Sequence, residues 1–241
     1  MVRNGLVSVR RYVFMIFALL VLVNAASVAQ GDPLQERLAA LKQSMAENKF
    51  QLMQYAWTET TQLTLKGDAK PASQERCRYG PDGKLVKTPV GIPPTPAGGG
   101  PIKKRMVEKK KGEMQEYLTD AKSLLHMYLP PDDLERMEKA REAGNMAVSQ
   151  GDGMVNVVIS NYIFGGDLMK LTFDPRAKKI TAISVNTYMD DPKNVVTLQV
   201  RMASLADGTS YIQEMVMNCP AKKMVVTTTN SDYQKVSGEG M

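Results

Sequence analysis

The chain has 241 residues, of which 43% are hydrophobic and 23% are charged, and its formal net charge is +6. With a single histidine, His126, and two cysteines, it has no Cys/His cluster at zinc-ligand spacing and only one candidate base for a hydrolytic triad. Neither a G-x-x-x-x-G-K phosphate loop nor a G-x-S-x-G nucleophile elbow occurs. We therefore expect a protein that is not an enzyme and that needs no metal or other cofactor.

Residues 1–29 have the three-part order of a secretory signal peptide. Three arginines precede the apolar run 12–23, and Ser27-Val28-Ala29 offers a small-x-small cleavage site. The run is short for a transmembrane helix, so an uncleaved membrane anchor is the less favoured alternative. The signal predicts export to the periplasm or the extracellular space. Its removal lowers the net charge from +6 to +3, because it takes three arginines and no acid, and this argues against a nucleic-acid partner.

The first element expected in the mature chain is an amphipathic helix over 33–48. Asp32 can cap it, Pro33 suits its first turn, and leucines recur at helical spacing after them. From Met53 to Leu65 the period changes to two, which predicts a strand with one wet face. The apolar face of that strand carries Met53, Tyr55, Trp57, Leu63 and Leu65.

Two more strands are expected at 73–79 and 84–90, joined by the turn Gly80-Pro81-Asp82-Gly83. Residues 67–71 are expected to form a turn, and the Pro/Gly-rich stretch 91–101 a linker. A helical insertion over 102–143 follows, in which Pro130-Pro131 separates a first helix from a second.

Polar residues of this insertion and of the later turns have structural interpretations. His126 falls on the polar side of the first inserted helix, where a solvated residue is expected. The pairs Asp132-Asp133 and Asp190-Asp191 lie beside prolines at the ends of elements, so they are interpreted as cap and turn residues rather than as acid–base groups or Ca²⁺ ligands.

Six apolar, β-branched runs at even spacing fill the last third and predict an antiparallel meander, at 153–164, 168–174, 179–189, 194–204, 210–217 and 222–230. Within the fourth run Val196, Leu198, Val200 and Met202 face one way. The tail 234–241 is expected to be disordered. The predicted fold class is α+β: a single domain over 30–233, with a curved antiparallel sheet or half-barrel of about nine strands, an N-terminal helix and an inserted helical pair covering one face.

This arrangement resembles the fold of the bacterial lipoprotein-carrier proteins LolA and LolB and their mycobacterial lipid-binding relatives. The resemblance rests on the helix at 33–48, the strand that opens Gln51-Leu52-Met53-Gln54-Tyr55-Ala56-Trp57, and the helices inserted before the meander. It implies an exported half-barrel whose mouth is plugged by the inserted helices. The segments 79–84, 109–111 and 220–223 resemble an uncharacterised family of exported bacterial proteins, which implies no activity.

Methionine is an unusual feature of the composition, since eight methionines fall in predicted strands. Flexible Met side chains suit a surface that adapts to varied apolar ligands, and ordinary core filling is the alternative. We predict that Met53, Tyr55, Trp57 and Leu63 line a site for lipid or another apolar ligand.

A basic cluster precedes the first inserted helix and consists of Lys103, Lys104, Arg105, Lys109, Lys110 and Lys111. Such a cluster attracts an anionic membrane surface or an acidic envelope protein, whereas the alternative is a solvated helix end. The cysteines also leave two possibilities open. Cys77 and Cys219 either form a disulfide in an oxidising compartment or remain two separate buried thiols.

The sequence therefore favours an exported binding protein that carries lipid or another apolar ligand in the cell envelope. The alternative is an envelope structural or interaction protein with a filled core and no small ligand.

Overall fold

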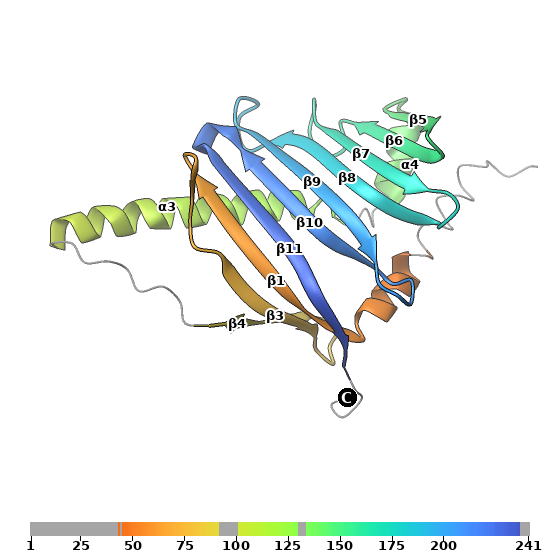
Figure 1. Ribbon diagram of the computed structural model, residues 1–241. Helices are drawn as coiled ribbons and strands as arrows, with labels where there is room; N and C mark the ends of the chain where they lie inside the picture. The colour runs from red at the N-terminus through yellow and green to blue at the C-terminus, as the bar shows by residue number, and fades with distance from the viewer. Residues whose placement is uncertain (1–42, 44, 92–100, 130–133, 237–241) are drawn as a thin grey trace, which may run out of the picture. The chain divides into compact units, whose positions relative to one another are not determined.

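An open sheet of eleven antiparallel strands dominates the computed structural model (Figure 1). The structure describes residues 43, 45–91, 101–129 and 134–236, without the side chains of 101–111 and 134. In chain order the elements are β1 (Tyr55–Leu65), β2 (Asp68–Ala69), β3 (Ser73–Tyr79), β4 (Leu85–Val90), α3 (Pro101–His126), α4 (Leu134–Glu142), β5 (Met146–Gly151), β6 (Met154–Ser160), β7 (Leu168–Asp174), β8 (Lys179–Tyr188), β9 (Val195–Ser204), β10 (Ser210–Cys219), the short 3-10 helix η1 (Pro220–Lys222) and β11 (Met224–Lys235).

The N-terminal helix ends later than the sequence predicts. Residues 45–52 are helical, and Met53 N–H donates to Lys49 O across 3.0 Å, which is a helical i→i−4 bond. Met53 and Gln54 then form a turn, so β1 begins at Tyr55 rather than at Met53. The part of the expected helix before residue 43, like the signal-peptide region, lies outside the described residues.

The strand order is β4-β3-β1-β11-β10-β9-β8-β7-β6-β5, with β2 paired to β1. The last strand, β11, returns to pair with the first, and this joins the N-terminal hairpins to the meander. The predicted curved antiparallel sheet is confirmed, but it has eleven strands rather than nine. The two missed strands are β2, which is two residues long, and β5, whose exposed residues show no alternation of apolar and polar side chains.

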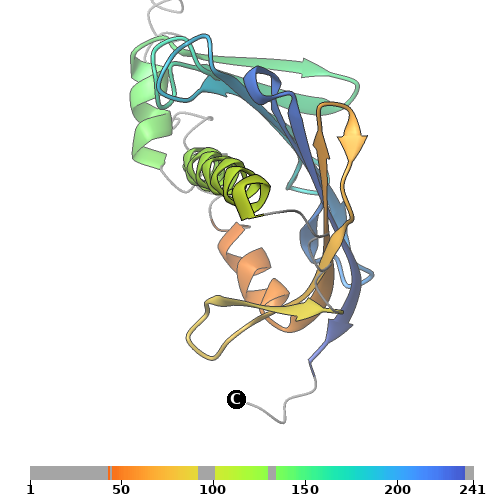
Figure 2. The same ribbon diagram turned by 90° about the vertical axis from the view of Figure 1, so that its left-hand side faces the viewer.

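The sheet is curved, and α3 lies on its concave side (Figure 2). Four side chains of α3 and of the turn after it face the sheet and are buried: Ala121, Leu124, Leu125 and Tyr128. His126 and Met127 point away and are exposed, as the sequence predicts for His126. Burial of one such leucine contributes about 1.5–3 kcal/mol, so this half of α3 is held mainly by apolar packing. Within the described residues, no helix combines the length and the apolar character that crossing a membrane requires.

A row of apolar residues crosses the concave face, each residue directly opposite the next in the register of neighbouring strands. The row runs Ile159, Met169, Val185, Leu198, Met217, Val226 and Leu63. The prediction that Val196, Leu198 and Val200 share a buried face is confirmed, since all three are buried on this side. Side chains alternate along each strand, so the residues directly before and after each member of this row point to the convex face.

The loop between β6 and β7 is organised by the carboxylate of Asp167, which is only 2% exposed. Its oxygens accept the backbone N–H groups of Tyr162, Ile163 and Phe164 across 2.6, 2.8 and 2.9 Å. Tyr128, just after α3, donates its hydroxyl to the same carboxylate across 2.6 Å. The loop and the end of the inserted helix are therefore fixed to one buried group.

The C-terminal strand continues past the point where disorder is expected. Gln234 and Lys235 belong to β11, where they pair with Ala56 and Tyr55. The pattern hides this extension because β11 has a bulge between the partners of Ala56 and Thr58, which breaks the alternation of its side chains. Residues 237–241 lie outside the described part of the chain.

Candidate ligand-binding face

The concave face is apolar but not fully covered. Leu63, Met202 and Met215 face inward in the strand register, yet each keeps part of its side chain accessible. By contrast, Met169 and Val185 are fully buried, as is Ile159 beside them in the row. The face thus has a filled region and a partly open region.

Aromatic side chains gather at the β1 end of this face. The Trp57 ring stacks on Tyr233 with centroids 5.5 Å apart and an interplanar angle of 12°, and it lies 5.7 Å from Tyr79. Tyr233 also contacts Tyr55 and Tyr211, at 6.3 and 4.4 Å. Burial is the main cause that raises the pKa of Tyr233, so its hydroxyl stays neutral. We call these five residues the aromatic cluster.

Charged residues border the aromatic cluster on its β3–β4 side. Lys87 pairs in register with Cys77, and its ammonium lies 2.5 Å from Glu59 and 3.9 Å from Glu75. Trp57 Nε1 donates to Asn230 Oδ1 across 3.1 Å. The concave face therefore passes from an apolar region over β6–β10 to a polar border over β1, β3 and β4.

A second polar group closes the aromatic cluster near the turn between β9 and β10. The Tyr55 hydroxyl donates to Asp207 Oδ2 across 2.5 Å, and Lys235 lies 3.3 Å from the same oxygen. The Tyr55 hydroxyl, followed by the backbone N–H of Thr209, holds the pKa of Asp207 well below its usual range. The same hydrogen bond raises the pKa of Tyr55.

The middle of α3 is tied to the strand ends by Tyr117. Its hydroxyl lies 2.9 Å from Asn194 Oδ1, and the Lys222 ammonium lies 5.0 Å from its ring centroid. Burial, followed by the neighbouring Cys219, raises the pKa of Tyr117 to about 12. Tyr117 therefore acts as a neutral hydrogen-bonding anchor for the helix that covers this face.

The two cysteines are separate buried thiols, and the possible disulfide is not formed. Cys77 lies opposite Trp57, whereas Cys219 lies opposite Met224, which pairs with Leu65. The eight residue steps of β1 from Trp57 to Leu65 span about 26 Å, far beyond the reach of a disulfide. Burial raises the pKa of both thiols.

The predicted ligand-binding residues are brought together in part. Tyr55 and Trp57 are buried members of the aromatic cluster, and Leu63 lies further along the same face. Met53 lies in the turn before β1, close to Gly83. The sequence missed Tyr79, Tyr211 and Tyr233 as members of the cluster. The alternation along β1 cannot predict which residues of other strands lie beside Trp57. For Tyr233, the bulge on β11 also breaks the alternation of that strand.

The basic cluster lies in the first half of α3. The backbone of Lys103, Lys104, Arg105, Lys109, Lys110 and Lys111 is helical, and their side chains lie outside the described part. Asp132 and Asp133 also lie outside it. Asp191 is a turn residue as predicted, because its Oδ1 accepts the N–H of Lys193 across 2.8 Å. Within the described residues, no three Cys, His, Asp or Glu side chains gather as a metal site would require.

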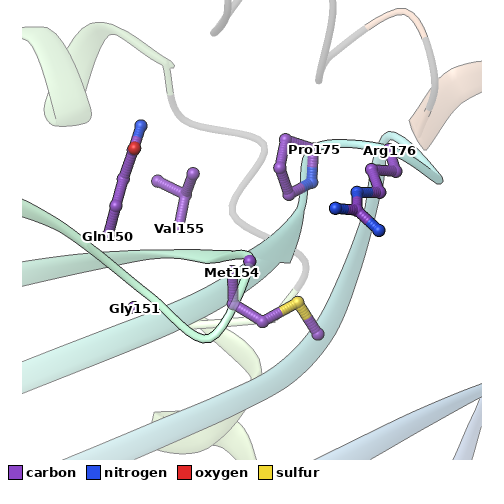
Figure 3. Close-up of a pocket in the computed structure, with 7 residues that line it drawn as sticks. Gln150, Gly151, Met154, Val155, Pro175 and Arg176 are labelled. Atoms are coloured by element: carbon purple, nitrogen blue, oxygen red, sulfur yellow. The ribbon is translucent and has the colours of Figure 1, made fainter.

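A hollow of about 420 Å³ lies at the other end of the sheet, between the β5–β6 and β7–β8 turns (Figure 3). It is lined by Gln150, Gly151, Gly153, Met154, Val155, Pro175 and Arg176. Figure 3 shows Pro175 and Arg176 facing Val155 and Met154 across it. None of the predicted ligand-binding residues borders this hollow.

Comparison with known proteins gives one structural similarity. No family model matches the chain. A search of the curated proteins finds no matching sequence. The crystal structure of a DUF1329 family protein from Desulfovibrio piger is similar at 12% sequence identity and a TM-score of 0.43, covering 86% of this chain and 95% of that protein.

Proposed function

We propose that this chain is an exported, non-enzymatic binding protein that carries lipid or another apolar ligand in the cell envelope. The observation that supports this best is the partly open, methionine-containing region of the concave face. Leu63, Met202 and Met215 face inward there and remain partly accessible. In the folded protein these side chains keep apolar surface in contact with water. An apolar guest that covers them removes this surface from water, which favours binding.

The energetics suit a passive carrier. Burying one acyl CH₂ group contributes about 0.8 kcal/mol, so a chain of several such groups binds without any reaction. Met202 and Met215 add adaptability, because the unbranched thioether side chain fills spaces of different shape. In this proposal the polar border at Glu59 and Lys87 orients the less apolar end of the guest.

The basic cluster has a separate role in this proposal. Six cationic residues near the start of α3 would draw the carrier to an anionic membrane surface or an acidic envelope protein. Such attraction weakens with salt, since the Debye length shrinks from about 10 Å at 0.1 M to about 3 Å at 1 M.

A pair of adjacent residues on β10 provides the test. Met215 faces inward, whereas Val216 faces outward and pairs with Thr227 and Gln199. Titration of the mature chain with a dansyl-labelled fatty acid should give saturable fluorescence enhancement. Met215→Trp, which fills the open region, should abolish it, and Val216→Trp should leave it unchanged.

The alternative, an envelope structural or interaction protein with a filled core, is supported by a different region of the same face. Leu124, Leu125 and Met137 are buried where the helices pack. If such packing extends over the whole face, the wild-type protein takes up no fatty acid and both tryptophan variants behave alike. That result would replace the carrier proposal with this alternative.

A further inference from the structure

The convex face carries an exposed apolar patch beside the β6–β7 loop. Phe164 is 37% exposed and Leu168 is 41% exposed. The Phe164 ring lies 5.5 Å from the ring of Tyr188, tilted by 32°. Tyr188 follows Thr187, which is buried and lies 2.9 Å from the Tyr128 hydroxyl on the concave side, so Tyr188 points the other way.

The loop that presents Phe164 is held rigidly by hydrogen bonds. Asp167 accepts the Phe164 N–H, and Asn161 Oδ1 accepts the Gly166 N–H across 2.7 Å. The Tyr188 hydroxyl donates to Gly165 O across 3.0 Å. A side chain that is ordered in advance loses little conformational entropy when a ligand binds to it.

Two rows of the convex face next to this patch are mainly polar and carry a single charged residue. In register order across the convex face lie Leu168, Asn186, Thr197 and Asn218, and the next row contains Ser184 and Gln199. Lys170 is the one charged residue in these two rows between β7 and β10. Asp190 and Asp191 follow Tyr188 in the β8–β9 turn, where Asp191 accepts a backbone N–H.

This combination points to the chemistry of the partner. A sugar ring has an apolar face of C–H groups, which packs on an aromatic ring, and neutral hydroxyls at its edge. Amide and hydroxyl side chains both donate and accept hydrogen bonds with such hydroxyls. An acidic polymer would need several cations. The two rows beside the rings offer only Lys170, because Arg201 in the following row is paired with Glu214 and Lys193 lies in a turn with Asp190 and Asp191.

We propose that the convex face around Phe164 and Tyr188 binds a neutral saccharide chain. The two rings form the stacking platform, and Asn186 and Thr197 bond the sugar hydroxyls. This site is separate from the concave face, so a chain that carries an apolar guest keeps it free.

Calorimetric titration of the mature chain with neutral hexasaccharides tests the proposal, using α-1,4-linked glucose, β-1,4-linked glucose and β-1,4-linked N-acetylglucosamine as probes. At least one should bind. Phe164→Ala and Asn186→Ala should each weaken that binding about tenfold or more. Phe50→Ala provides a matched control, because Phe50 is 66% exposed on the N-terminal helix and should leave the affinity unchanged.

The melting temperatures of the variants should equal that of the wild type, since these side chains are exposed. If Phe164→Ala is unfolded, Phe164→Tyr replaces it as the test, and this variant should retain binding because it keeps an aromatic ring. The proposal is overturned if no hexasaccharide binds, or if binding survives Phe164→Ala. It is also overturned if Phe164 is needed instead for sedimentation with phosphatidylcholine vesicles or for dimer formation in analytical ultracentrifugation.

Discussion

The hydroxyl of Tyr128 lies 2.6 Å from a buried Asp167 carboxylate oxygen and joins the end of α3 to the loop between β6 and β7. Both groups are almost inaccessible to water. Burial, and then this hydrogen bond, raises the pKa of Tyr128, so the hydroxyl stays a donor at neutral pH. One contact thus fixes the cover of the concave face and the loop that reaches the convex face.

Tyr128→Phe should destabilise the protein through this contact. The change removes one donor from Asp167 and leaves the Thr187 hydroxyl without its partner. We expect a loss of about 1–3 kcal/mol in the free energy of unfolding, measured in urea. Tyr188→Phe removes a partly exposed hydrogen bond to Gly165 and should cost less. Equal losses in the free energy of unfolding for the two variants would show that the buried contact stabilises the protein no more than the partly exposed one.

Asp207 should make stability depend on acid pH. The Tyr55 hydroxyl is the main cause that lowers the pKa of Asp207 in the folded protein below its ordinary value of 3.8. The contribution of Asp207 to the free energy of unfolding is therefore present above pH 3.8. As the pH falls below that value the unfolded chain takes up a proton first, and stability is lost until the folded carboxyl is protonated too. Thermal melts from pH 5 to pH 2 should therefore fall more steeply for the wild type than for Asp207→Asn. Parallel curves would mean that Asp207 is not involved.

Cys77 and Cys219 should be unreactive thiols in the folded protein. Burial raises both pKa values, so little thiolate forms at neutral pH. Ellman's reagent should label neither residue in buffer and both in guanidinium chloride without reductant. A denatured protein with no free thiol would contradict this and would mean that the pair is oxidised.

Much of the sheet is readable from the sequence because its signal is local. The alternation of Val196, Leu198 and Val200 with polar residues places a buried face correctly, and α3 begins within one residue of the helical insertion predicted over 102–143. These patterns can be recognised without knowing which strand or helix packs beside them. The edge strand β5 gave no such pattern, because only its pairing with β6 makes it a strand.

The site was harder to predict because its residues meet through tertiary structure. Tyr233 reaches Trp57 only because β11 returns beside β1 and bulges there. Asp167 lies between the predicted strand runs 153–164 and 168–174, so the sequence indicates its place in a loop but not its role. Its role depends on Tyr128, which is distant in sequence and is brought to it by the path of α3.

Mass spectrometry of lipids extracted from the purified mature protein tests the central proposal most directly. We expect an acyl-containing lipid to accompany the wild type and the Val216→Trp variant and to be absent from Met215→Trp. A wild-type protein that carries no apolar molecule, and takes none up from added fatty acid, would contradict a carrier role for the concave face.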